Sequence, residues 1–154
     1  MNYDILIESA NALLKDEPNN LSLLSNATAF INDHINDLNW VGFYLYNNGV
    51  LTLGPFQGKV ACNKILPGKG VVGTSYVNNE VIVVKNVHEI ENHIMCDANS
   101  MSEVVIPIRN GKEIYAIFDF DSPIENRFDD KLVQFLRQFA ALIEKYIDFN
   151  APLI

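Results

Sequence analysis

The stretch Trp40-Val-Gly-Phe-Tyr-Leu-Tyr46 is followed by Asn48-Gly49 and then by Val50-Leu-Thr-Leu53. β-Branched and aromatic residues favour strands because they pack well on a pleated surface. Asn-Gly between two such runs is a strong signal for a tight hairpin turn. The stretch therefore predicts two antiparallel strands near the start of a sheet.

A second hairpin is predicted further along, where Glu103–Arg109 and Lys112–Asp121 flank Asn110-Gly111. Shorter strands are expected near Cys62–Leu66 and Val81–Val84. Strands that are joined mainly by hairpins form a mostly antiparallel sheet.

The segments before and after these strands in the sequence have the periodicity of helices. The first 35 residues predict two helices separated by Pro18-Asn19-Asn20, and residues Asp129 to about Asp148 predict a last amphipathic helix. In each helix, apolar residues recur at spacings of three and four. Helices at both ends and hairpins between them predict a single α+β domain over residues 1–154.

Composition narrows the class of protein. The 154 residues carry a formal charge of −8, from 19 acidic and 11 basic side chains, and 49% of the residues are hydrophobic. An acidic surface repels phosphate backbones, which makes nucleic acid a poor partner. No apolar run approaches the roughly 20 residues of a membrane span, and the N-terminus lacks the basic region of a signal peptide. We expect a cytoplasmic protein without a membrane or nucleic-acid partner.

Strand alternation separates two faces of the predicted sheet. Side chains point to opposite faces with a period of two. The face expected to pack on the helices carries Val41, Phe43, Leu45, Ala116, Phe118 and Phe120. The opposite face then carries Trp40, Tyr44, Asp119 and Asp121. If the aperiodic segment 85–102 folds over that face, it encloses a pocket with an aromatic wall and acidic groups.

Two simpler interpretations remain open at this point. Asp119 and Asp121 could lie at a solvated strand end, where carboxylates are common. Trp40 could serve only to pack the sheet.

The two cysteines, Cys62 and Cys96, form no C-x-x-C pair, and either could be a small buried apolar residue. Cys96 is the better candidate for reactivity because it lies in a polar segment. His88, His93 and Cys96 match no zinc spacing, so no metal and no cofactor is expected. Gly68-Lys-Gly70-Val-Val-Gly73 lacks a parallel crossover unit, and we interpret it as a turn and a helix start instead of a dinucleotide site.

Several stretches together resemble the free methionine-(R)-sulfoxide reductase family, in family order across residues 39 to 129. They are Asn39-Trp-Val-Gly-Phe-Tyr44, Leu53-Gly-Pro-Phe-Gln-Gly-Lys59, Ala61-Cys62, Gly68-Lys-Gly70, His93-Ile-Met-Cys-Asp-Ala-Asn-Ser100, Ser102-Glu-Val-Val-Ile-Pro107, Asp119-Phe-Asp-Ser-Pro123 and Arg127-Phe-Asp129. The resemblance implies a GAF fold, with the terminal helices on one face of the sheet and a ligand pocket on the other.

The resemblance also implies an activity and a set of site residues. The activity is thiol-dependent reduction of free L-methionine-(R)-sulfoxide, a product of oxidative stress, with thioredoxin as the reductant. Cys96 would be the catalytic thiol and form a sulfenic acid, and Cys62 would recycle it through a Cys62–Cys96 disulfide. The substrate-binding residues would be three carboxylates and two aromatics: Glu103, Asp119, Asp121, Trp40 and Tyr44.

One departure from the family pattern concerns Val72. Family members commonly carry a third cysteine there, so a scheme with three thiols is excluded and a two-thiol cycle is expected. The alternatives are a non-catalytic GAF module that senses a small ligand, and a structural homodimer with inert thiols. Sensors are usually fused to an output domain, whereas this sequence ends soon after its last predicted helix, which favours the enzyme.

Overall fold

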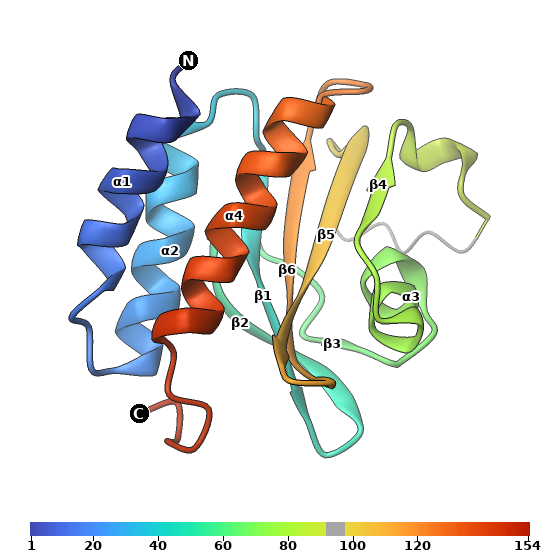
Figure 1. Ribbon diagram of the computed structural model, residues 1–154. Helices are drawn as coiled ribbons and strands as arrows, with labels where there is room; N and C mark the ends of the chain where they lie inside the picture. Colours follow the sequence, from blue (N-terminus) through green and yellow to red (C-terminus); the bar gives the residue numbers. More distant parts are fainter. Residues whose placement is uncertain (92–97) are drawn as a thin grey trace.

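The computed structural model describes residues 1–91 and 98–154. Helices flank a central sheet in sequence and in space (Figure 1). The elements are α1 (Tyr3–Leu14), α2 (Asn20–His34), β1 (Trp40–Asn47), β2 (Val50–Gly58), β3 (Lys64–Ile65), α3 (Gly70–Asn78), β4 (Ile82–Val84), the short 3-10 helix η1 (Val87–Glu89), β5 (Ser102–Asn110), β6 (Glu113–Ser122) and α4 (Asp130–Tyr146).

The six strands form one sheet in the order β3-β2-β1-β6-β5-β4, and every neighbouring pair is antiparallel. Both predicted hairpins are confirmed, and their turns place Gly49 and Gly111 at φ values of 81° and 63°. β2 extends five residues beyond the predicted Leu53, through Gly54 and Pro55, which are atypical of strands. Cross-strand pairing with β1 overrides that local preference, with one register shift between Gly42 and Tyr44.

Helices α1, α2 and α4 cover one face of the sheet (Figure 1). Side-chain oxygens of Asn2, Asn19 and Asp129 cap their N-termini by accepting bonds from first-turn N–H groups. Phe43 and Phe118 stack with ring centroids 4.0 Å apart at the centre of this layer, and both are fully buried. Burying such a side chain contributes about 1.5–3 kcal/mol. The predicted helix-facing residues of β1 and β6 lie in this layer, so the predicted alternation is confirmed.

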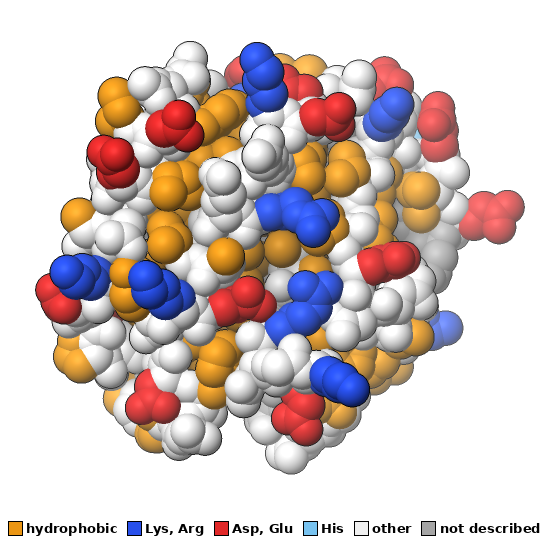
Figure 2. All heavy atoms as spheres, viewed as in Figure 1, with side chains coloured by type: hydrophobic (Ala, Val, Ile, Leu, Met, Phe, Trp, Pro, Cys, Tyr) orange, Lys and Arg blue, Asp and Glu red, His pale blue; other side chains and the backbone are white. Residues whose placement is uncertain are grey.

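The opposite face of the sheet carries α3 and a second, smaller apolar cluster that includes Trp40, Tyr44, Val72 and Ile117. α3 begins at Gly70, inside the glycine-rich stretch, which confirms the expected turn and helix start. Among the described helices, none is both long and apolar enough to cross a membrane. On the face shown in Figure 2, acidic and basic side chains are interspersed. The sheet thus separates a helix-packed core from a face that can hold a ligand.

Candidate active site

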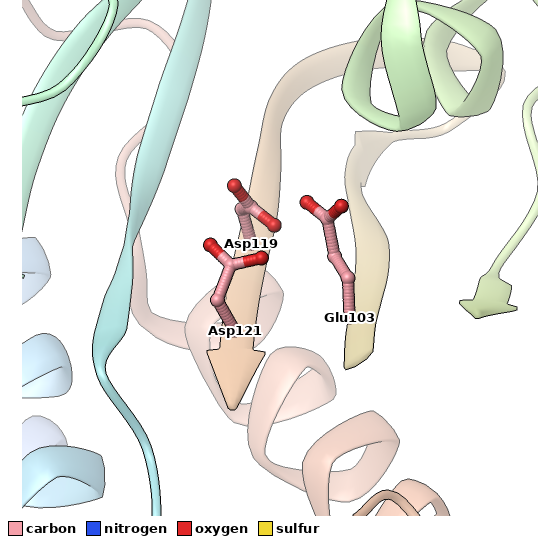
Figure 3. Close-up of side chains that lie close together, drawn as sticks. All are labelled: Glu103, Asp119 and Asp121. Atoms are coloured by element: carbon pink, nitrogen blue, oxygen red, sulfur yellow. The ribbon is translucent and has the colours of Figure 1, made fainter. Parts of the chain in front are cut away.

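Three carboxylates lie together on the face of the sheet opposite the terminal helices. Asp119 and Asp121 are two residues apart on β6, and Glu103 on β5 is directly paired with Asp121. The three carboxyl groups lie close together (Figure 3), and one oxygen from each lies within 4.8 Å of the other two. All are buried, with exposed fractions of 5% for Glu103, 5% for Asp119 and 9% for Asp121. The interpretation of Asp119 and Asp121 as a solvated strand end is therefore wrong.

Burial and mutual repulsion favour the protonated forms of these groups. Burial, and after it the charge of Asp121, raise the pKa of Glu103 to about 8, although a hydrogen bond with Asp119 partly opposes the shift. Burial, followed by the charge of Glu103 and the hydrogen bond between the two carboxyls, raises the pKa of Asp119 well above its ordinary value. Near neutral pH the cluster therefore retains at least one proton, and it can donate a hydrogen bond as well as attract a cation.

One oxygen of Asp119 stands out among the carboxylates. Its Oδ1 is buried and has no hydrogen-bond partner among the described residues. A buried polar atom without a partner is costly, and at a functional site it points to a ligand. An ammonium group or a metal ion would satisfy this oxygen, and the three carboxylates are close enough together to ligate a metal. Sequence analysis predicted no metal site.

Trp40 and Tyr44 form an aromatic wall next to the carboxylates. Both project from β1 to the pocket side, and their rings stack with centroids 5.9 Å apart. The single side-chain donor of each residue binds a backbone carbonyl. Trp40 Nε1 donates to Lys59 O at 3.2 Å, and Tyr44 Oη donates to Cys62 O at 2.9 Å. The wall therefore offers ring surface to a ligand, because its side-chain donors are already used.

A pocket of about 500 Å³, counting the part open to solvent, lies between this wall and the carboxylates. Its remaining lining residues come from the segment after β2, from the start of α3 and from the end of segment 85–102: Val60, Ala61, Ile65, Lys69, Gly70, Val71, Val72 and Ser100. Among the described residues, the lining thus combines an apolar part, an acidic part and the basic side chain of Lys69.

Some lining residues were not assigned a role from the sequence. Lys69 and Ser100 lie within stretches that carry the family resemblance, which was the available signal. Ala61 lies in such a stretch as well, whereas Val60 gave no signal, because only the path of the chain after β2 brings it to the pocket. Trp40 satisfies both sequence interpretations, since it packs within the second apolar cluster and also lines the pocket.

Of the two cysteines, the structure describes only Cys62. Cys62 is half-buried in the segment between β2 and β3, and its carbonyl is held by Tyr44. Cys96 and His93 lie outside the described residues, so their predicted roles stay predictions. His88 is exposed in η1.

Comparisons with known proteins agree with this architecture. The model of the GAF domain matches residues 20–147. The chain is 42% identical to the free methionine-R-sulfoxide reductase of Escherichia coli, over 94% of this chain and 88% of that protein. It is 44% identical to the fRMsr of Staphylococcus aureus over 96% of both chains, with TM-scores of 0.92 for the reduced form and 0.90 for the complex with substrate. The free methionine-R-sulfoxide reductase of Neisseria meningitidis, also in complex with its substrate, is 31% identical over 94% of this chain and 87% of that chain, with a TM-score of 0.90.

Proposed function

The chain belongs to the free methionine-R-sulfoxide reductase family of GAF-domain proteins, and from this membership we propose that it reduces free L-methionine-(R)-sulfoxide to L-methionine. The observation that carries the proposal is the position of three buried carboxylates beside the aromatic wall of Trp40 and Tyr44. A free amino acid has an α-ammonium group for the carboxylates and, in this case, an apolar methyl group for the rings.

The same cluster explains why the substrate is the free amino acid. A methionine sulfoxide within a peptide has an amide in place of the α-ammonium, so it cannot satisfy an ionised buried carboxylate. The Oδ1 of Asp119, which has no hydrogen-bond partner in residues 1–91 and 98–154, supports this role for the cluster. Lys69, the basic side chain of the lining, is placed to attract the substrate's carboxylate.

The chemistry begins with the thiolate of Cys96, which attacks the sulfoxide sulfur because the thiol is a poor nucleophile. The sulfoxide oxygen becomes more basic as attack proceeds and takes a proton or hydrogen bond from the cluster. The raised pKa of Glu103 and of Asp119 suits either group for this donation. The oxygen is transferred to Cys96, which becomes a sulfenic acid, and methionine leaves.

Cys62 then recycles the enzyme. Its sulfur forms a disulfide with Cys96, and the oxygen of the sulfenic acid leaves as water. A dithiol reductant, thioredoxin, exchanges with the disulfide and restores both thiols. This cycle needs two cysteines, the number that the chain contains.

The test is an assay that couples turnover to thioredoxin and compares four substrates: the R and S sulfoxides, each free and within a peptide. We expect methionine to form only from the free R sulfoxide. Dithiothreitol in place of thioredoxin separates the reduction from the choice of reductant. If the free R sulfoxide binds but no methionine forms with either reductant, the chain is a sensor module and the proposed activity is wrong.

A further inference from the structure

The segment 59–62, here called the strap, connects β2 to the region before β3 and has no regular secondary structure. Val60 and Ala61 in its middle line the pocket, and Cys62 is its last residue. Val60 is 88% exposed, so the strap gains little from burial in the core. Cys62 is disulfide-bonded in the structure, and hydrogen bonds hold the strap at both of its ends.

Both ends of the strap are bound by side chains of β1. Trp40 Nε1 holds Lys59 O, and Tyr44 Oη holds Cys62 O. The two aromatic residues are 3% and 2% exposed, so these donors lie on rigid, buried rings. Beyond Cys62, the backbone of Asn63 is fixed to β2, because its carbonyl accepts from Leu53 N at 3.0 Å. Two side-chain hydrogen bonds therefore hold the strap itself, and one of them is made to the backbone of the cysteine.

The hydroxyl of Tyr44 remains a hydrogen-bond donor near neutral pH. Burial, with the nearby charges of Asp119, Asp121 and Glu103, raises the pKa of its hydroxyl above the ordinary value. The hydroxyl therefore keeps its proton and remains a donor. Its hydrogen bond runs to the carbonyl of Cys62, whereas the ring faces the pocket. Removing the hydroxyl alone would leave the ring wall in place.

We propose that Tyr44 is a positioning residue for Cys62, which fixes the backbone of the recycling cysteine so that its sulfur is presented to the oxidised Cys96. This inference rests on the two-cysteine cycle of the proposed function. The step concerned is attack by the Cys62 sulfur on the sulfenic sulfur. The S–S bond forms, the S–O bond breaks, and the oxygen leaves as water with its own proton and the thiol proton of Cys62. Tyr44 acts on this step through the carbonyl of Cys62 and not through the reacting sulfurs.

The test compares Tyr44→Phe with the wild-type protein in a single turnover. Reduced protein is mixed with one equivalent of free R sulfoxide, and methionine release and disulfide formation are followed separately by quenched flow and mass. We expect the ratio of the disulfide-formation rate to the methionine-release rate to fall about threefold to tenfold, the usual worth of one neutral hydrogen bond. A trap for sulfenic acid should label the variant more than the wild-type protein.

Tyr46→Phe is the matched control, because it removes a hydroxyl from the same strand outside the pocket, where the side chains of Tyr46 and Tyr76 are hydrogen-bonded. It should leave the ratio unchanged. An equal loss in both rates for Tyr44→Phe, or no loss in either, would overturn the inference.

A second arm separates this inference from the proposed function. Hydrogen peroxide oxidises a reactive thiol to a sulfenic acid without any methionine sulfoxide. Disulfide formation after peroxide should again be slower in Tyr44→Phe than in the wild-type protein. If the wild-type protein forms the disulfide with peroxide but makes no methionine from the sulfoxide, the proposed reductase activity is wrong. Slower disulfide formation in Tyr44→Phe after peroxide would still support the role of Tyr44. A wild-type protein that forms no disulfide in either arm would contradict the role of Tyr44.

Discussion

Glu103 on β5 and Asp121 on β6 are directly paired across the sheet, so two buried carboxylates face each other on the same side of adjacent strands. Like charges in this position destabilise a sheet. Asp119, two residues along β6, adds a third acidic group to the same face. The fold therefore holds three carboxyl groups so close together that full ionisation of all three is unfavourable, which is typical of a site shaped for binding or catalysis.

The carboxylates should be needed for activity and not for folding. Asp121→Asn and Glu103→Gln keep the size of the side chain and remove a charge-assisted contact, which typically contributes about 1.5–3 kcal/mol. We expect kcat/KM to fall by roughly tenfold to a hundredfold. The Tm should stay the same or rise, because a buried like-charge contact is removed.

Glu113→Gln is the control for this pair, since Glu113 is exposed on the same strand as Asp121. It should leave kcat/KM unchanged. Normal kcat/KM in both Asp121→Asn and Glu103→Gln would show that the substrate does not bind where we place it.

The stability of the ligand-free protein should fall as pH rises from about 5 to 8. The pKa of Glu103 is about 8 in the fold against an ordinary value of 4.5, and that of Asp119 is raised in the same direction. Between these values the folded state binds more protons than the unfolded state, so the free energy of unfolding decreases with pH. Urea unfolding at pH 5 and pH 8 measures the difference. Glu103→Gln should reduce it, and stability that is flat or increasing over this range would contradict the raised pKa values.

Replacing each cysteine by serine should block a different step of the cycle. Cys96→Ser should abolish methionine formation, because it removes the nucleophile. Cys62→Ser should release about one methionine per protein and then stop, because the sulfenic acid cannot be recycled by thioredoxin. Rapid-quench counting of methionine per protein distinguishes the two variants. Full steady-state turnover in Cys62→Ser would rule out the two-thiol cycle.

Val72 should tolerate a cysteine. The residue is buried in the pocket lining, and valine and cysteine are similar in size. If two thiols suffice, Val72→Cys should change kcat by less than about tenfold, or about 1.4 kcal/mol in the barrier. The thioredoxin-coupled assay gives this number. A much larger gain would indicate that the natural chain lacks a thiol that its catalysis requires.

The absence of a side chain at Gly58 should be needed for the Trp40 ring to keep its position. A Cβ at Gly58 would lie 2.6 Å from Trp40 Cδ1 and 2.8 Å from Asn39 O, and its φ of 138° disfavours any other residue. Backbone strain and overpacking each cost about 1–3 kcal/mol, so Gly58→Ala should lower stability by at least about 2 kcal/mol and raise KM.

Gly111→Ala provides the comparison for Gly58→Ala. Gly111 also has a positive φ, of 63°, but a Cβ there would meet nothing within 4 Å. We expect a loss of about 1 kcal/mol and an unchanged KM. If the two variants have the same KM, contact with Gly58 does not control the position of Trp40.

Local patterns predicted much of the fold. Alternation in β1 and β6 assigned Phe43 and Phe118 to the helix side and Trp40 and Asp119 to the pocket side, as the structure has them. Alternation is readable because it depends only on the period of the strand. The end of β2 was missed, since Gly54 and Pro55 conceal a strand that pairing with β1 maintains.

The sequence by itself determined the α+β class, the two hairpins, the faces of β1 and β6 and, through its resemblance, the residues of the acidic and aromatic groups. Tertiary structure decided which of these groups meet. The pairing of Glu103 with Asp121 depends on the register of β5 against β6, and a shift of one residue would turn Glu103 to the other face. Burial decided the protonation of Glu103 and Asp119, because the energy of a charge depends on the surrounding solvent and on neighbours that are distant in the sequence. The bond from Tyr44 to Cys62 likewise exists only because the chain after β2 returns across the pocket face of β1.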